Sequence, residues 1–214
     1  RMEVLKKTNG DQRPVESSQL TGSTYYLKTP NIEEIYKKID NFILNDNLDS
    51  ALFLTDYLIV NNSKNSLAYT KRGHINFLKE NYDAAEANYQ KAINIEPLSY
   101  GAYFTQIFSP SGGIEEVGLS IIYDDIQSDP KKSIELLEKL KKLDPSNPVA
   151  YQEIARDKNW GLNQSDDALK VLKYAVNEIP HESFEFYKKH HYQFYGDYNL
   201  SIMSSLLSNI SYVL

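Results

Sequence analysis

Apolar residues recur at helical spacing along most of the chain after Pro30. The first stripe, at intervals of three and four, comprises Ile32, Ile35, Ile39, Phe42 and Ile43. This period predicts a helix with one buried face. Asn31 precedes the stripe as a plausible N-cap. A polar turn at 45–47 and a second apolar segment over 48–60 follow, so the pattern predicts a helix–turn–helix unit.

Residues 66–99 repeat this arrangement most clearly. They predict one helix over about 66–79 and a second over about 82–95, joined by the polar turn Glu80-Asn81. Pro97 ends the second helix, because proline cannot continue the helical hydrogen-bond ladder. Gly73 and Ala85 are small residues where two helix backbones would approach closely. The stretch therefore predicts two short helices folded back on one another.

A period relates this unit to its neighbours. Ala51 and Ala85 lie 34 residues apart. A small residue followed by a proline 12 positions later occurs three times, at Ala85 and Pro97, Ser133 and Pro145, and Ala168 and Pro180. The chain therefore contains an internal repeat. Since one such unit cannot bury its own apolar face, several must stack.

The best unit closely resembles a tetratricopeptide repeat, a 34-residue helix–turn–helix module. Seven residues fall at that family's offsets: Tyr69, Gly73, Tyr82, Ala85, Tyr89, Ala92 and Pro97. Asn76 and Arg72 depart from the family's usual aromatic and leucine. The resemblance implies an all-α fold, a right-handed α-solenoid of about five such units. Residues 31–214 would form it, with units at about 32–65, 66–99, 100–147, 149–182 and 182–214.

The third unit is irregular, because Ser133 lies 48 residues after Ala85, which is 14 more than one period. Two arrangements fit. In the preferred one, residues 99–108 form an extra helix and 114–127 form the first helix of the unit. In the other, 99–108 is that first helix, since Tyr103 lies 34 residues after Tyr69, and the segment after the Ser109-to-Gly113 turn is inserted.

The two ends of the chain differ from the repeats. Residues 1–30 lack helical periodicity and carry turn signals, so we expect a mobile or loosely docked tail. The last predicted helix, 198–214, has no charged residue. Because repeat arrays need a polar terminal face, we expect either further repeats beyond it or self-association through it.

Composition narrows the function classes. The 214 residues are 41% hydrophobic and 24% charged, which is typical of a soluble globular chain. A net charge of −6 disfavours nucleic acid, whose phosphates require a basic face. No run of about 20 apolar residues predicts a membrane span. The absence of cysteine excludes disulfides and a cysteine nucleophile. It does not fix the compartment, and of the possible compartments we favour the cytoplasm.

Catalytic and metal motifs are missing from the sequence. It contains no HExxH, no glycine-rich phosphate loop and no GxSxG elbow. The adjacent His190 and His191 would point about 100° apart on a helix, unlike an i, i+4 metal pair. We therefore expect no enzyme activity, no metal and no cofactor.

The resemblance instead implies a concave peptide-binding groove lined by the first helix of each unit. The groove residues carried over by register are Tyr36, Asp40, Thr70, His74, Phe77, Glu153, Asp157, Trp160, Phe186 and His190. Aromatic anchors and carboxylates at these positions favour a protein or peptide partner with apolar and basic residues. A clamp for acidic chaperone tails would require several basic groove residues, which are missing.

The expected function is therefore non-catalytic protein or peptide binding, as an adaptor, scaffold or assembly factor. The alternative is a recognition module of a larger enzyme or secretion machine whose catalytic part lies outside this chain.

Overall fold

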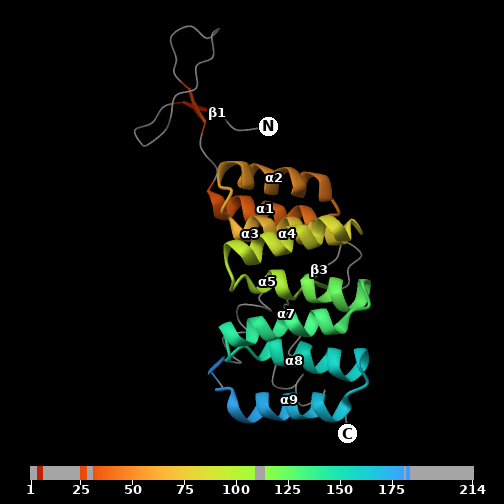
Figure 1. The fold of residues 1–214 in the computed structure, drawn as a ribbon. Helices are drawn as coiled ribbons and strands as arrows, with labels where there is room; N and C mark the ends of the chain where they lie inside the picture. Colours follow the sequence, from red (N-terminus) through yellow and green to blue (C-terminus); the bar gives the residue numbers. More distant parts are fainter. Residues whose placement is uncertain (1–3, 7–24, 28–30, 109–113, 181, 184–214) are drawn as a thin grey trace.

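The structure, a computed structural model, describes residues 4–6, 25–27, 31–108, 114–180 and 182–183. It confirms the all-α solenoid: antiparallel helix pairs stack into one column (Figure 1). Outside the column, β1 (Val4–Lys6) pairs antiparallel with β2 (Tyr25–Leu27). The division into a tail and five units remains a prediction, and most of the fifth unit lies outside the described residues.

The first two units are regular helix pairs. They consist of α1 (Ile32–Leu44) with α2 (Leu48–Asn61), and α3 (Ser66–Leu78) with α4 (Tyr82–Ile95). Asparagines begin three of these helices: the side chains of Asn31, Asn47 and Asn65 each accept a bond from a first-turn backbone N–H. Such caps satisfy amides that have no partner inside the helix. The helices agree with the sequence prediction to within one or two residues.

The third unit differs from both arrangements predicted for it. Its first helix begins as α5 (Tyr100–Tyr103), is interrupted by a hairpin of β3 (Thr105–Phe108) and β4 (Ile114–Val117), and resumes as α6 (Leu119–Ile121). The π-helical turn η1 (Ile122–Ile126) ends it, and α7 (Pro130–Leu143) is its partner. The helix predicted over 114–127 is therefore wrong in its first part, and 99–108 is a single helical turn followed by a strand.

Local contacts allow the helix to resume after the hairpin. Gly118 has φ of 135°, and a Cβ there would lie 2.5 Å from the Tyr103 carbonyl oxygen, so only glycine fits. The Ser120 hydroxyl donates a hydrogen bond to the same carbonyl at 2.9 Å. The hairpin is thus an insertion inside one helix, and Tyr103 keeps the place of Tyr69 in the repeat.

The fourth unit consists of α8 (Pro148–Arg156), the π-helical turn η2 (Asp157–Gly161) and α9 (Ser165–Glu178). In the third and fourth units the closing backbone bond of the interhelix turn spans six residues, from Asp129 N to Tyr123 O and from Gln164 N to Lys158 O. In the second unit it spans five, from Asn81 N to Asn76 O. Each π-helical turn therefore holds one extra residue.

Each interhelix turn also contains one residue with positive φ. These four residues are Asp46, Glu80, Ser128 and Asn163. Successive members lie 34, 48 and 35 residues apart. The first value is the repeat period, and the second includes the hairpin inserted in the third unit. The value of 35 reflects the extra residue of η2.

Close helix approach fixes the spacing within each unit. Gly73 of α3 lies directly against the buried Tyr89 ring of α4. The equivalent positions pair residues of complementary size: Ile39 with Thr55, Ser120 with Leu137, and Ala155 with Leu172, all buried. A large residue on one helix thus corresponds to a smaller one on the other.

We expect Gly73→Ala to destabilise the fold, because its Cβ would lie 2.5 Å from Tyr89 Cδ1 in a place where the ring cannot move aside. Overpacking of this kind costs about 1–3 kcal/mol. Gly101→Ala is the matched control: both changes gain helix propensity, but the added Cβ at 101 comes no closer than 3.3 Å to Thr70 Cγ2. Urea unfolding measures both. Equal stability of the two variants would contradict the packing account.

Candidate functional site

The predicted groove residues of the first unit join neighbouring helices. The Tyr36 hydroxyl donates to Asn65 Oδ1 at 2.7 Å, and Asp40 forms an ion pair with Lys71 at 2.6 Å. Burial raises the pKa of Tyr36, which keeps its hydroxyl protonated as a donor. Both bonds connect α1 to α3 or its N-cap, so these side chains hold two units together.

Thr70 and His74 of the second unit serve the same purpose one repeat further on, and both are buried. The Thr70 hydroxyl lies 3.1 Å from that of Ser99. His74 Nε2 lies 3.1 Å from the Gly101 carbonyl oxygen, so Nε2 carries the proton and donates. Burial, together with the charge of Lys71, lowers the pKa of His74 to about 3. The imidazole is therefore neutral near pH 7 and acts as a packing contact.

Phe77 is partly buried among the core residues and lies edge-on to Tyr82, with ring centroids 5.3 Å apart. It supports the core more than it offers a surface. The last two predicted groove residues, Phe186 and His190, lie outside the described residues.

In the fourth unit the π-helical turn shifts the register of the groove positions. The Tyr151 hydroxyl bonds to the Pro145 carbonyl as Tyr103 bonds to Pro97, which makes Tyr151 the equivalent of Tyr103 and Tyr69. The fifth and ninth positions are then Gln152 and Arg156, one residue before Glu153 and Asp157. By this count Glu153 and Asp157 do not occupy the fifth and ninth positions, and both are buried, at 2% and 0% exposure. Their part in peptide binding stays a prediction.

Glu153 and Asp157 instead belong to a buried charge cluster around Arg156. The guanidinium lies 2.8 Å from Glu153, 3.4 Å from Asp157 and 3.8 Å from Asp124. It also lies over the Phe104 ring, 5.9 Å from its centroid. The cluster joins η1, α8 and η2. The sequence analysis did not identify Arg156 and Asp124. Tyr151, which occupies the place of Tyr69 in the repeat, would have fixed the register that places Arg156 at the ninth position.

Three carboxylates lie around one guanidinium, and Asp157 is the most deeply buried of them. Burial raises the pKa of Asp157 to about 7; the hydroxyl of Ser133 and the charge of Arg156 oppose this rise, and Asp124 adds to it. Asp157 thus titrates near neutral pH, because burial disfavours its charged form.

Ile32 and Leu67 are exposed at the N-terminal ends of α1 and α3, and three further exposed apolar residues lie at the C-terminal ends of first helices. Leu44 ends α1, Ile126 ends η1, and Trp160, at 63% exposure, is the last residue but one of η2. Leu44 and Ile126 lie two residues before the positive-φ residue of the following turn, and Trp160 lies three residues before its own, so the three share one end of their helices but not one repeat position. The units of a solenoid align these helix ends along one edge. We call Leu44, Ile126 and Trp160 the apolar edge. Of the ten predicted groove residues, only Trp160 belongs to it.

Among the residues that the structure describes, no group of three or more histidine and acidic side chains could hold a metal ion. In the same residues no helix has the length and apolar character that crossing a membrane requires.

Comparisons with known proteins agree with this architecture. Residues 67–97 match the family model of the tetratricopeptide repeat. A crystal structure of MamA shares 24% identity over 75% of this chain and 76% of that chain, with a TM-score of 0.52. TTC0263, a thermophilic tetratricopeptide-repeat protein of Thermus thermophilus, shares 13% identity over 85% of this chain and 89% of that chain, with a TM-score of 0.50. A search of curated proteins finds no match.

At these identities the structural likeness shows the fold, and the family model matches one unit. The chain therefore carries a tetratricopeptide repeat, and its described helices form the solenoid of tetratricopeptide-repeat proteins.

The raised pKa of Asp157 predicts how stability depends on pH. An unfolded aspartate titrates near 3.8, so between about pH 4 and 7 the folded state holds a proton that the unfolded state has lost. The stability contribution is present at low pH and is lost as pH rises through this window. Asp157→Asn removes the titration, so its stability relative to wild type should rise by roughly 2–4 kcal/mol from pH 4.5 to 8.

Denaturant unfolding at both pH values measures this difference. Asp46→Asn, in an exposed interhelix turn, is the matched control. A difference between Asp157→Asn and wild type that stays constant with pH would refute the assignment.

Proposed function

We propose that the chain is a non-catalytic protein-binding module that recognises a peptide segment through its apolar edge. The carrying observation is that Leu44, Ile126 and Trp160 stay exposed at the C-terminal ends of first helices, while the groove positions Thr70 and His74 are buried in contacts between units. Exposed apolar side chains repeated along one edge favour an extended partner that contacts several units at once. Trp160 is the natural anchor, since tryptophan dominates many protein interfaces.

Acidic residues accompany the apolar edge. Asp46 and Glu80 lie in interhelix turns, and Asp125 precedes Ile126; all three are exposed. With a net charge of −6, the chain would attract a basic partner and repel an acidic one. The proposed ligand is therefore a peptide with apolar side chains and one or more Lys or Arg. An adaptor or assembly role follows from binding of this kind.

A synthetic peptide array that varies apolar content against Lys and Arg content tests this proposal. We expect apolar, basic peptides to bind and their acidic counterparts to fail. For the peptide that binds most tightly, Trp160→Ala should raise the dissociation constant about 10- to 100-fold, because the anchor is lost. Isothermal titration calorimetry measures this change.

Leu143→Ala is the matched control, since Leu143 is an exposed apolar residue of α7 away from the apolar edge. It should leave the affinity within about twofold of wild type. Equal losses for the two variants, or a preference for acidic peptides, would contradict the proposal.

A further inference from the structure

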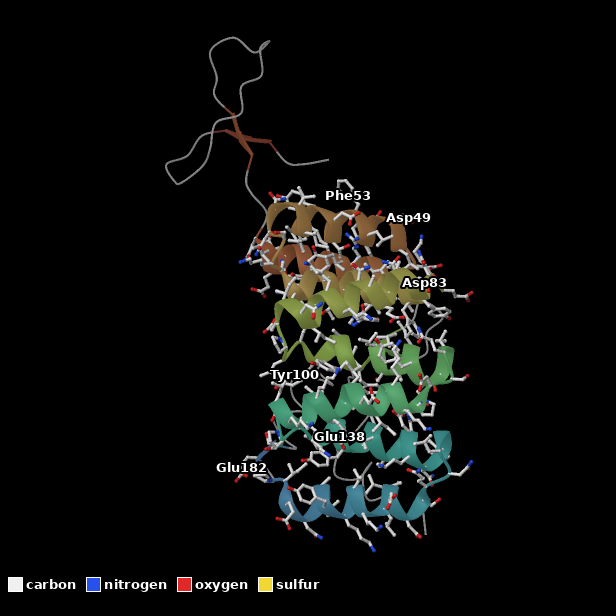
Figure 2. The ribbon with its side chains drawn as sticks, viewed as in Figure 1. Asp49, Phe53, Asp83, Tyr100, Glu138 and Glu182 are labelled. Carbon is white, nitrogen blue, oxygen red and sulfur yellow. The ribbon has the colours of Figure 1, made fainter. Side chains whose placement is uncertain are left out.

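The first helix pair presents an apolar surface that the apolar edge does not include. Phe53, Tyr57 and Val60 of α2 follow one another at helical spacing, and Phe53 and Val60 are 70% and 84% exposed. We call these three residues the outer face of α2. Figure 2 shows Phe53 projecting from α2 at the end of the array, away from the other helices. Three large apolar side chains are therefore exposed to solvent next to one another.

The second helices of the other units show that this face is unusual. Their equivalent residues are also exposed, so the position is outward-facing throughout the array. They are Ala87, Lys91 and Asn94 in α4, Glu135, Lys139 and Lys142 in α7, and Lys170, Tyr174 and Asn177 in α9. Seven of these nine residues are charged or amides, whereas all three on α2 are large and apolar. A contiguous exposed apolar patch of this kind indicates a contact surface.

The strand pair β1–β2 is a suitable occupant, because it needs a surface to pack on. Its strands have three residues each, and their register places Val4 opposite Leu27 and Leu5 opposite Tyr26. An isolated two-stranded hairpin is marginally stable in water and gains stability by packing against a helix. The outer face of α2 offers the strand pair an apolar surface to pack on, and the strand pair would shield that face from water.

The chain is long enough to bring them together. Only residues 28–30 separate Leu27 from Asn31, the N-cap of α1, and four residue steps reach at most about 14 Å. Because α1 and α2 are antiparallel, the start of α1 lies beside the end of α2, where Val60 is located. One helix diameter is about 10 Å, so the outer face is within reach. Figure 1 shows the strand pair beyond this same end of the array and apart from α2, so the contact requires the linker to fold back.

Charge favours the same contact. Residues 1–30 contain five Lys or Arg and three Asp or Glu, a net charge of +2. Since the whole chain carries −6, the remaining residues carry −8. On α2 itself, Asp49 and Asp56 are exposed but already form ion pairs with Lys79 and Arg72, at 2.7 and 2.8 Å. The attraction is therefore between a basic segment and the acidic remainder of the chain as a whole.

We propose that β1–β2 packs onto the outer face of α2 and covers the first unit of the solenoid. The face comprises three side chains, far fewer than the 20–30 residues per partner of a stable interface. A tethered segment binds at high effective concentration and avoids most of the entropy cost of association. This makes the chain's own strand pair a better occupant than a separate molecule. The contact does not depend on what the apolar edge binds.

Cysteine cross-linking in the full chain tests the contact, because the natural sequence has no cysteine. Under mild oxidation, Leu27→Cys with Val60→Cys should form an intramolecular disulfide, which requires Cβ atoms about 4 Å apart. Leu27→Cys with Asn94→Cys is the control, because Asn94 is the exposed equivalent of Val60 in α4. We expect the first pair to react at least about tenfold faster. Equal rates, or a disulfide-linked dimer in place of the monomer, would overturn the proposal.

Amide hydrogen exchange gives a second, cysteine-free measurement. Phe53→Lys with Val60→Lys should preserve the fold, because other second helices carry Lys142 and Lys170 at equivalent positions. Wild type should protect the amides of Tyr25 to Leu27, and the double variant should lose that protection while α3 and α4 keep theirs. Equal exchange of these amides in the two proteins would show that the outer face does not hold the strand pair.

Discussion

The close approach of the two helices within each unit is the constraint on which the rest of the structure depends. Gly73 lies directly against the Tyr89 ring, and the other units pair large with smaller buried residues at the same positions. Closely packed interiors tolerate little change in volume, so the spacing of each pair is fixed. Additional residues must then leave the helix axis. The chain places them in a hairpin beside Gly118 and in the π-helical turns η1 and η2, which lets the solenoid continue through the third unit.

The same packing decides which side chains remain available to a partner. Positions that would line a groove are used between units, by Asp40 with Lys71 and by His74 with the Gly101 carbonyl. In the fourth unit Arg156 is enclosed by carboxylates. Such a buried cluster fixes geometry more than it adds stability, because desolvation offsets much of the attraction between the charges. In the proposed function, recognition is left to the ends of the first helices, where Trp160 is exposed.

The sequence predicted the regular part of this fold because its signals are periodic. Ala51, Ala85 and Pro97 fixed the phase, and the helices of the first two units follow it closely. The hairpin was not predictable in the same way, since Thr105–Phe108 and Ile114–Val117 are too short to distinguish a strand from a helical turn. The extra residue of η2 was equally unpredictable, because the sequence allows it in the interhelix turn or in the helix. Its location in the helix shifts the register by one residue, and Glu153 and Asp157 are buried. Burial between units cannot be read from one unit, so Thr70 and His74 were predicted as binding residues.

The central claim is that the ends of the first helices, and not the inner positions of those helices, recognise the partner. A solution NMR titration of the wild-type chain with its tightest peptide tests this claim most directly. The account predicts shifts of the Trp160 indole N–H and of the Leu44 and Ile126 methyl groups, with the Thr70 methyl and the His74 ring unchanged. Shifts confined to Thr70 and His74, with Trp160 unaffected, would contradict it.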